Sequence, residues 1–492
     1  MARGVILFGS SFFLVRRDAD GLLQTAFSAA TPLRAIPMKP CVHTFLPRHR
    51  SLAAALSLAL AGATAPPSVE AHTAAQLRTV QNCDDSGVGS LRAVYASALD
   101  GDEVSMTQLA CSTITLTSGP IRSGTDAGYV LLQGPLDHSL TVSGNHAGRV
   151  IMHDGSRVAV DNLYITAGVA NDAAGGGCIY SSGDVLLGHS TVSDCEVSTS
   201  GAIAARGGGI RALRAVVLGI SRVTGNRARA AAADADGGGL HALYLISGSQ
   251  STISDNTASS NGTHLARGGG AFASGYVRCD DTTFSGNGAE GGGAIYVGDS
   301  NQFFTPPITN VTISGNSAVG AAGGILARRS IKVFNSTITG NGAGFDFGAG
   351  IYLSAGNAEL HSTIVANNTT GGGLNTADIA GHAGAMITGA HNLVTASTLA
   401  LPPDTISAEP LLGPLAENSG RAFTHALLPG SPAIDKGENP RGISHDERGF
   451  VCPPDRQCIQ AERTIGVATD IGAFEVGALD RIFHHGFEPG EL

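Results

Sequence analysis

A few short stretches of the chain carry residue types that can cleave polysaccharides. Asp280 and Asp281 are adjacent carboxylates, residues 375–378 read Asn-Thr-Ala-Asp, and residues 381–384 read Gly-His-Ala-Gly. Paired carboxylates can protonate a leaving group and activate a water molecule, while the basic run 329–332 could hold an acidic sugar. Neighbouring residues of a strand point to opposite faces, so the two aspartates can share one groove only in a turn. We therefore interpret the pair as solvated turn residues and predict no catalytic residue.

A lyase would need different chemistry, in which an arginine or lysine base acts beside a carboxylate-bound calcium ion. Arg278 beside Asp280 is the one local arrangement of this kind. Lysine is scarce, because the chain contains only Lys39, Lys332 and Lys436. A polysaccharide lyase or a glycoside hydrolase acting on acidic polysaccharide is therefore the alternative function.

The remaining titratable residues indicate structure rather than chemistry. His425 has no carboxylate or cysteine at ligand spacing, so we predict that it bonds a loop. His484 and His485 could bind a metal only as a pair in the tail. Residues 446–448 (Asp-Glu-Arg) predict a solvated turn or an ion pair, and Asp470 is expected to anchor the last coil. We predict no metal and no cofactor.

Two signatures recur in step and indicate what must position these residues. One is a glycine cluster followed by an apolar residue, and the other is an apolar residue three positions before an asparagine. The successive asparagines lie 30, 31, 29, 25 and 26 residues apart. The asparagines are Asn226, Asn256, Asn287, Asn316, Asn341 and Asn367, and the clusters contain Gly208, Gly238, Gly269 and Gly292.

This period, with β-branched residues alternating with Ser and Thr, predicts the coils of a parallel β-helix. Strands of successive coils then pair at about 4.8 Å, so that equivalent positions stack. A glycine column lets consecutive coils approach closely at a corner, and stacked asparagine amides can bond along a ladder. We predict an all-β solenoid of about ten coils over residues 108–400.

An open solenoid end exposes strand edges, so we expect a cap over residues 72–107. Residues 89–99 place their apolar side chains on one helix face, with Ser90 as a plausible N-cap. That face should dock on the first coil. Its residues are Leu91, Val94, Tyr95, Ala98 and Leu99.

Residues 1–71 are expected to be a leader and signal peptide. Basic residues precede the apolar run 52–63, and residues 69–71 (Val-Glu-Ala) form a small-x-Ala cleavage pattern. Met38 would be a better start, which indicates either a misassigned start codon or an extended leader. No later stretch reaches the ~18 apolar residues of a transmembrane helix. We expect cleavage near Ala71 and an extracellular or cell-surface protein.

Seven cysteines follow the leader, which contains Cys41. Their spacing suggests local disulfides in a compartment that permits them, although spacing alone leaves other connectivities open. Cys279 would stay unpaired. The expected pairs are Cys83–Cys111, Cys178–Cys195 and Cys452–Cys458.

Composition limits the class of partner. The formal net charge is -10 and no basic stripe is present, which argues against nucleic acid. At 42% hydrophobic residues, mostly small and aliphatic, the chain has enough apolar surface for a long core. We expect a monomer.

Several motifs resemble known families. Residues 79–104 resemble the N-terminal segment of bacterial secreted β-helix proteins of the CSLREA type, and residues 284–287 and 292–295 are similar to the repeats of polymorphic outer membrane proteins. Residues 409–475 resemble the choice-of-anchor Q domain, which suggests a C-terminal segment over 401–476 and a tail over 477–492. The resemblance implies a right-handed, pectin-lyase-like β-helix outside the cell, in families whose activity is mostly undefined.

The fold and the resemblance together favour a role in contact. We predict a secreted or cell-surface rod for adhesion, surface display or glycan contact, without catalysis. Its partner would be a glycan or a host or cell-surface ligand. In the irregular loop 299–307, Phe303 and Phe304 either pack on the neighbouring coil or meet a sugar ring, and we favour packing.

Overall fold

The computed structural model of the chain describes residues 4–8, 11–17, 23–25, 75–247, 250–261, 263–300, 304–345, 347–371, 377–451 and 459–477. The chain divides into two units, residues 1–70 and 71–492. In the first unit, β1 (Gly4–Phe8), β2 (Ser11–Arg17) and β3 (Leu23–Thr25) form an antiparallel sheet. The expected signal segment, its cleavage site and Cys41 lie outside the described residues.

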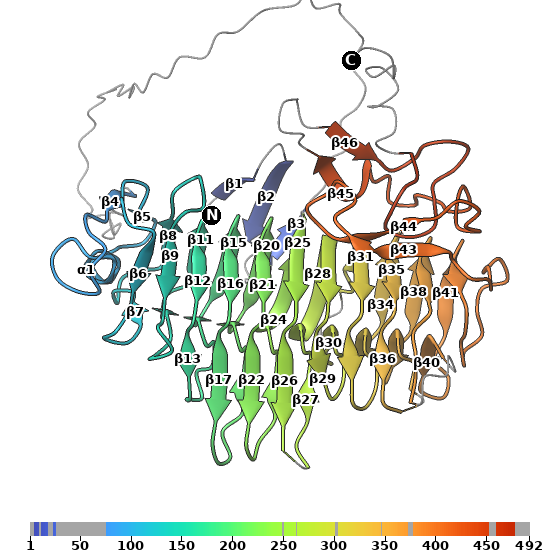
Figure 1. The fold of residues 1–492 in the computed structure, drawn as a ribbon, viewed down its shortest axis with the longest axis horizontal. Coiled ribbons are helices and arrows are strands. Elements are labelled where there is room, and N and C mark those ends of the chain that lie inside the picture. The colour runs from blue at the N-terminus through green and yellow to red at the C-terminus, as the bar shows by residue number, and fades with distance from the viewer. Residues whose placement is uncertain are drawn as a thin grey trace, which may run out of the picture. The chain divides into compact units, whose positions relative to one another are not determined.

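The second unit is a right-handed parallel β-helix (Figure 1). Each full coil contributes three short strand segments, and each segment pairs in parallel with its equivalents in the neighbouring coils, which gives three columns of strands.

Column A contains β7 (Ile121–Arg122), β10 (Ile151–His153), β14 (Ile179–Ser181), β19 (Ile210–Ala212), the first parts of β24 (Leu240–Ser247) and β28 (Ala271–Ser285), β30 (Ile295–Val297), β33 (Ile325–Ala327), β37 (Ile351–Leu353) and β40 (Ile379–Gly381). Column B contains β4 (Leu77–Thr79), β5 (Glu103–Ser105), β8 (Tyr129–Gln133), β11 (Arg157–Asp161), β15 (Asp184–Gly188), β20 (Ala215–Gly219), later parts of β24 and β28, the start of β31 (Pro307–Ser314), β34 (Ile331–Phe334), β38 (Ala358–His361) and β41 (Ile387–Ala390). Column C contains β6 (Thr113–Thr115), β9 (Thr141–Ser143), β12 (Tyr164–Thr166), β16 (Thr191–Ser193), β21 (Arg222–Thr224), β25 (Ser251–Ser254), the ends of β28 and β31, β35 (Thr337–Thr339), β39 (Ile364–Ala366) and β42 (Leu393–Val394). Column C thus has eleven strand segments in the described chain, close to the ten coils expected.

The core is built from the inward residues of these columns. In column C the central residue of each strand is apolar and almost fully buried, and each contributes roughly 1.5–3 kcal/mol. Cys279 is also wholly buried and is unpaired. The stacked central residues of column C include Val142, Ile165, Val192, Val223, Ile253, Phe284, Ile313, Ile338 and Val365.

An asparagine ladder follows column C. Each amide donates from Nδ2 to Oδ1 of the asparagine one coil further on, at 2.8–2.9 Å. The ladder begins where the Cys195 amide donates to Asn226 and ends at Asp378, whose Oδ1 accepts two bonds from the last asparagine. Its members are Asn226, Asn256, Asn287, Asn316, Asn341 and Asn368.

Asn367 does not belong to this ladder, so the expectation for that residue was wrong by one position. Val365 pairs with Ile338, which places Asn368 level with Asn341. Asn367 instead occupies the left-handed position that Gly340 has one coil earlier, with φ 59° against 65°. Its side chain donates to Glu409 at 2.7 Å.

The glycine clusters form the corner before column A. The glycine three residues before the first residue of column A has a left-handed backbone, as at Gly237 (φ 71°) and Gly292 (φ 65°). The next glycine is needed for close approach, because a Cβ at Gly238 would lie 2.4 Å from the carbonyl oxygen of Gly269. Gly208 and Gly269 occupy this same position in their own coils.

The N-terminal cap contains one short helix, α1 (Leu91–Ala96). Ser90 caps it by accepting from the Ala93 amide at 3.3 Å, and Leu91 and Tyr95 are buried. Residues 97–99 lie beyond its end, so it is shorter than the apolar pattern indicated. The cap segment also supplies β5, which already belongs to column B.

Two disulfides lie at the N-terminal side of the rod. Cys83 is bonded to Cys111, and Cys178 to Cys195. The proposed Cys452–Cys458 pair lies outside the described residues.

Between columns C and A, several coils extend into a small arm with an alanine-rich core. Its larger sheet contains β13 (Val169–Ala170), β17 (Glu196–Thr199), β22 (Arg227–Ala230), β26 (Thr257–Ser260), β29 (Gly288–Ala289), β32 (Ser317–Ala318) and β36 (Gly342–Ala343), and its smaller sheet contains β18 (Ala205–Arg206), β23 (Ala235–Asp236) and β27 (Ala266–Arg267).

Residues 409–451 and 459–477, which we call the C-terminal segment, fold back along a side of the rod (Figure 1). Two antiparallel pairs organise this segment: β43 (Leu412–Ala416) with β44 (Thr424–Leu427), and β45 (His445–Val451) with β46 (Ile459–Glu462). At the last coils the outward residues Ile364 and Leu393 form an apolar cluster with Leu427 and Ile471 of the segment.

Candidate functional site

The outward residues of column C form two rows along the rod, mostly of hydroxyl groups. Each strand contributes two outward side chains, one on either side of its buried central residue. The surface they form is the column C face. From β6 to β35 its residues are Thr113 and Thr115, Thr141 and Ser143, Tyr164 and Thr166, Thr191 and Ser193, Arg222 and Thr224, Thr252 and Ser254, Thr283 and Ser285, Thr312 and Ser314, and Thr337 and Thr339.

The C-terminal segment covers the later part of this face and uses its hydroxyl groups as bonding partners. Thr283 Oγ1 accepts from the Phe423 amide at 2.8 Å and lies 3.2 Å from a carboxylate oxygen of Glu447. The Thr312 hydroxyl bonds the other oxygen of Glu447. Thr337 Oγ1 accepts from the Ala473 amide at 3.0 Å. These threonines and Glu447 are almost completely buried, so bulk solvent has little access to the contact.

Histidines and the bend before column C add further contacts. His425 lies 2.7 Å from the Gly413 carbonyl and 2.8 Å from the Ser314 hydroxyl, so it joins its loop to the rod. His445 Nε2 lies 3.0 Å from Asp281 Oδ2. Asn310 Nδ2 donates to the His445 carbonyl at 2.9 Å.

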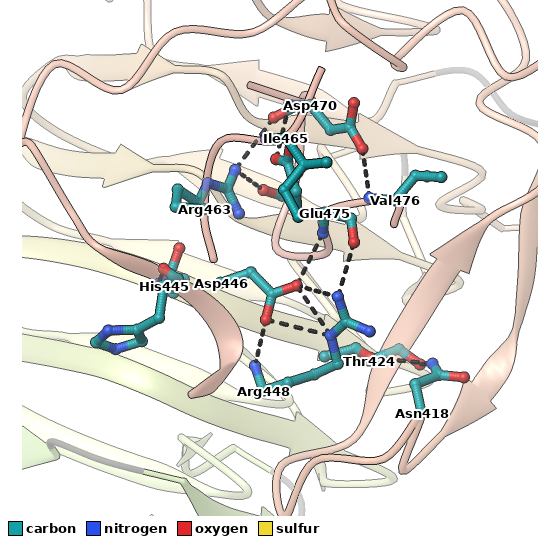
Figure 2. Close-up of polar contacts among 12 residues, drawn as sticks. Asn418, Thr424, His445, Asp446, Arg448, Arg463, Ile465, Asp470, Glu475 and Val476 are labelled. Carbon is teal, nitrogen blue, oxygen red and sulfur yellow. Dashed lines mark hydrogen bonds and ion pairs between the residues drawn. The ribbon is translucent and has the colours of Figure 1, made fainter. Parts of the chain in front are cut away.

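Behind this contact, a buried polar network holds the C-terminal segment together (Figure 2). Arg448 donates to Asp446 at 2.6 and 2.9 Å and to the Glu475 carbonyl at 2.7 Å. The Glu475 carboxylate accepts the amides of Ile465 and Asp470. Residues 446–448 are at most 4% exposed, so the solvated-turn alternative was wrong and the ion pair holds for Asp446 and Arg448.

Asp470 supports the segment itself. Its carboxylate accepts the amide of Val476 at 2.7 Å (Figure 2). It also accepts the amide of Asp435 at 2.8 Å, and both partners belong to the C-terminal segment. Asp470 was predicted to anchor the last coil, but it instead joins loops within the C-terminal segment.

Burial shifts Glu447 and Glu475 toward their protonated forms. Burial raises the pKa of Glu475 to about 8 and raises the pKa of Glu447 well above its usual value. Burial by itself would lower the pKa of His445, but the hydrogen bond and charge of Asp281 raise it above the ordinary value. All three shifts favour the protonated state of the docked segment.

The residues that suggested polysaccharide cleavage do not assemble. Asp280 points outward from column B and pairs with Arg278 at 3.2 Å. Asp281 adopts a left-handed bend (φ 48°) and faces His445, so the two carboxylates diverge. Asp281 is only 7% exposed, which corrects the interpretation of the pair as solvated turn residues.

The other fragments have structural partners. Asp378 terminates the asparagine ladder, and burial raises its pKa. His382 lies 2.9 Å from the Ala383 carbonyl and 3.0 Å from that of Gly356. Lys332 pairs with Glu359 at 2.7 Å. Among the described residues, no group of three or more His, Cys, Asp or Glu is arranged to hold a metal.

Aromatic rings stack along the outer side of column B. Tyr244 and Tyr276, from adjacent coils, have ring centroids 4.4 Å apart, and Phe304 meets Tyr276 edge-on at 6.1 Å. Phe304 packs on the coil and yet stays 63% exposed. Arg329 donates to the Phe304 carbonyl at 2.9 Å. Phe303 and the His484–His485 pair lie outside the described residues.

Sequence reasoning missed two features that had a signal. The tyrosines occur at equivalent positions of successive repeats, in Ala-Leu-Tyr-Leu and Ser-Gly-Tyr-Val. The hydroxyl rows were visible as the Thr-x-Ser or Thr-x-Thr pattern around the core residue of most coils. No local signal showed which hydroxyls the C-terminal segment would cover.

Comparison with known proteins supports the fold. Residues 233–370 match the family model described as the right handed beta helix region. No curated protein and no solved structure matches the chain. In the part of the chain that the structure describes, no helix has the length and apolar character needed to cross a bilayer.

Proposed function

We propose that the protein is an extracellular or cell-surface rod that contacts glycans or cell surfaces without catalysis. The observation that carries this proposal is the aromatic row of Tyr244, Tyr276 and the largely exposed Phe304. The apolar face of a sugar ring can pack on an aromatic ring, and the hydroxyl groups at its edge bond nearby polar side chains. Stacked coils repeat such contacts along the rod axis.

Charged residues of both signs flank the aromatic row. Arg278 and Lys332 lie beside Asp280 and Glu359 on the outer side of column B, and each cation pairs with one of these acids. Such a surface offers hydrogen bonds to a sugar chain without a strong field of one sign. This arrangement supports binding of an extended ligand.

An extracellular location is part of the proposal. The Cys83–Cys111 and Cys178–Cys195 disulfides support it, because disulfides persist in oxidising compartments. The leader pattern of residues 1–71 and the choice-of-anchor Q resemblance of residues 409–475 point the same way.

The test is a glycan array probed with the purified chain from residue 72 onward. We expect binding to at least one glycan class, weakened about 2- to 10-fold by Phe304→Ala, since an aromatic contact contributes roughly 0.5–1.5 kcal/mol. The matched control is Val319→Ala, which removes another exposed apolar side chain, 75% exposed, elsewhere on the rod.

Activity assays on pectin, alginate and chondroitin complete the test. New reducing ends or unsaturated products would overturn the non-catalytic role and establish the lyase or hydrolase alternative. Failure to bind any glycan or cell surface would contradict the contact role itself.

A further inference from the structure

We propose that the first four strands of the column C face form a binding surface for a neutral polysaccharide. This inference rests on the proposed contact function and assigns it a second surface and a ligand class. The strands are β6, β9, β12 and β16, and we call their outward surface the uncovered half. Their outward residues are Thr113, Thr115, Thr141, Ser143, Tyr164, Thr166, Thr191 and Ser193.

The chemistry of these positions is uniform. Every one of the eight side chains carries a hydroxyl group, and none carries a charge. Because the strands are in register, the hydroxyls repeat at about 4.8 Å along the rod and extend over roughly 14 Å. Each hydroxyl can both donate and accept a hydrogen bond, as the hydroxyls of a sugar can.

These side chains are accessible. Thr113 and Thr115 are exposed, the other threonines and serines are partly exposed, and Tyr164 is 44% exposed in the middle of the rows. Within the rows, Ser193 donates to Thr166 at 3.2 Å, which orients hydroxyls across neighbouring coils. The tyrosine offers a ring face to a sugar, and the surrounding hydroxyls offer hydrogen bonds.

The C-terminal segment already binds the later part of the same face through its hydroxyl groups. Further along the same rows, Thr283, Thr312 and Thr337 bond backbone amides and a carboxyl group of the C-terminal segment. That segment reaches as far as Arg222, whose guanidinium lies 5.9 Å from the Phe423 ring centroid. Among the described residues, the C-terminal segment stops short of the eight positions above, which leaves them for a ligand.

Charge selects the ligand class. The uncovered half has no cation among its outward residues, and the whole chain has a formal charge of -10. An acidic polysaccharide would gain no ion pair there and would be repelled at long range. A neutral polysaccharide matches the face in polarity and hydrogen-bonding capacity.

The experiment is affinity electrophoresis of the chain from residue 72 onward in gels containing xyloglucan, galactomannan or alginate. We expect retardation by at least one of the two neutral polymers. Tyr164→Ala should weaken this retardation about 2- to 10-fold, and the double variant Thr141→Val/Thr191→Val by about 5-fold or more. Tyr164→Phe keeps the ring and should retain most of the binding.

The matched control is Thr257→Val, which makes the same substitution at an exposed strand position in the arm. Unchanged thermal midpoints establish that each variant is folded. Equal retardation of wild type and the Tyr164 and threonine variants overturns the inference, as does retardation by alginate alone. If alginate binding is lost on Phe304→Ala but not on Tyr164→Ala, this inference fails while the proposed contact function stands.

Discussion

The two halves of the column C face have nearly the same strand sequences and opposite surroundings. Thr-Val-Ser in β16 presents partly exposed hydroxyls, whereas Thr-Ile-Ser at the end of β31 presents hydroxyls that are at most 7% exposed. The difference comes from a segment more than a hundred residues away along the chain. The comparison shows that the repeat sequence can determine the backbone of a coil without determining whether its outward side chains are buried or exposed.

The covered half also shows two ways of burying a β-helix face. In the middle coils, hydroxyls are buried with partners such as Glu447, which avoids the cost of an unsatisfied polar group. In the last coils the outward positions become apolar, and Ile364 packs on the segment instead. The polar part can face solvent when uncovered, whereas the apolar part must be covered by the C-terminal segment to stay buried.

The largest effect on stability should come from breaking the ion pair that holds the C-terminal segment together. Arg448→Met leaves Asp446 buried without its cation, which costs about 3–5 kcal/mol. Urea unfolding, with hydrogen exchange read over residues 409–477, measures the loss. Arg328→Met breaks an exposed pair with Asp299 and should cost no more than about 1 kcal/mol. Similar losses in the two variants would show that the buried network does not hold the cover.

A rise in pH should destabilise the contact between the C-terminal segment and the later part of the column C face. The uncovered half should be unaffected. In the folded protein, burial raises the pKa of Glu475 to about 8, above the value in the unfolded chain. The contribution of Glu475 to the free energy of unfolding is therefore present in acid and is lost as the pH rises toward 8. The raised pKa values of Glu447 and His445 act in the same direction. We expect a loss of roughly 2–4 kcal/mol between pH 5 and 9, by linkage.

Hydrogen exchange at a series of pH values, corrected for the intrinsic exchange rate, measures this effect. Glu475→Gln should flatten the profile for residues 409–477. A profile that is the same for the segment and for the first coils would contradict the assignment to the cover.

A smaller effect should follow from Thr283→Val in the covered half. The variant leaves the Phe423 amide without its acceptor and removes a partner of Glu447, which costs about 1–3 kcal/mol. Thermal or urea unfolding would detect it. Thr312→Val should cost a similar amount, and an unchanged stability in both would mean that the hydroxyls do not hold the segment.

The smallest effect should follow from the same substitution in the uncovered half. Thr141→Val and Thr191→Val should change the free energy of unfolding by no more than about 0.5 kcal/mol, because both side chains face solvent in part. A loss as large as that of Thr283→Val would show that the two halves are buried alike and would remove the contrast between them.

Much of the fold could be predicted because each coil carries the local sequence signals that determine its own structure. The period, the glycine corners and the asparagine three positions after a core residue specify stacking at Asn256 or Asn316 without reference to distant sequence. Asn367 was misplaced because Ala366-Asn367-Asn368 offers two candidate asparagines, and only the pairing of Val365 with Ile338 selects between them.

The site was less predictable because it depends on contacts between remote segments. Nothing near Glu447 indicates that Thr283 and Thr312 will surround it, and nothing near Asp281 indicates that His445 will face it. Local patterns report alternation and turns, whereas burial of a charged residue depends on which distant surface it meets.

The asparagine ladder has a direction. Each Nδ2 donates one N–H to the Oδ1 of the following coil and the other to a backbone carbonyl of the preceding coil. The bonds between the side chains therefore all run toward the C-terminus, and this series of bonds finishes in N–H donors at its C-terminal end. The last of them meets a carboxylate, Asp378, the group that best accepts such an end. A longer rod could therefore evolve by duplicating a coil anywhere before Asp378, whereas a coil added after it would face a terminated column.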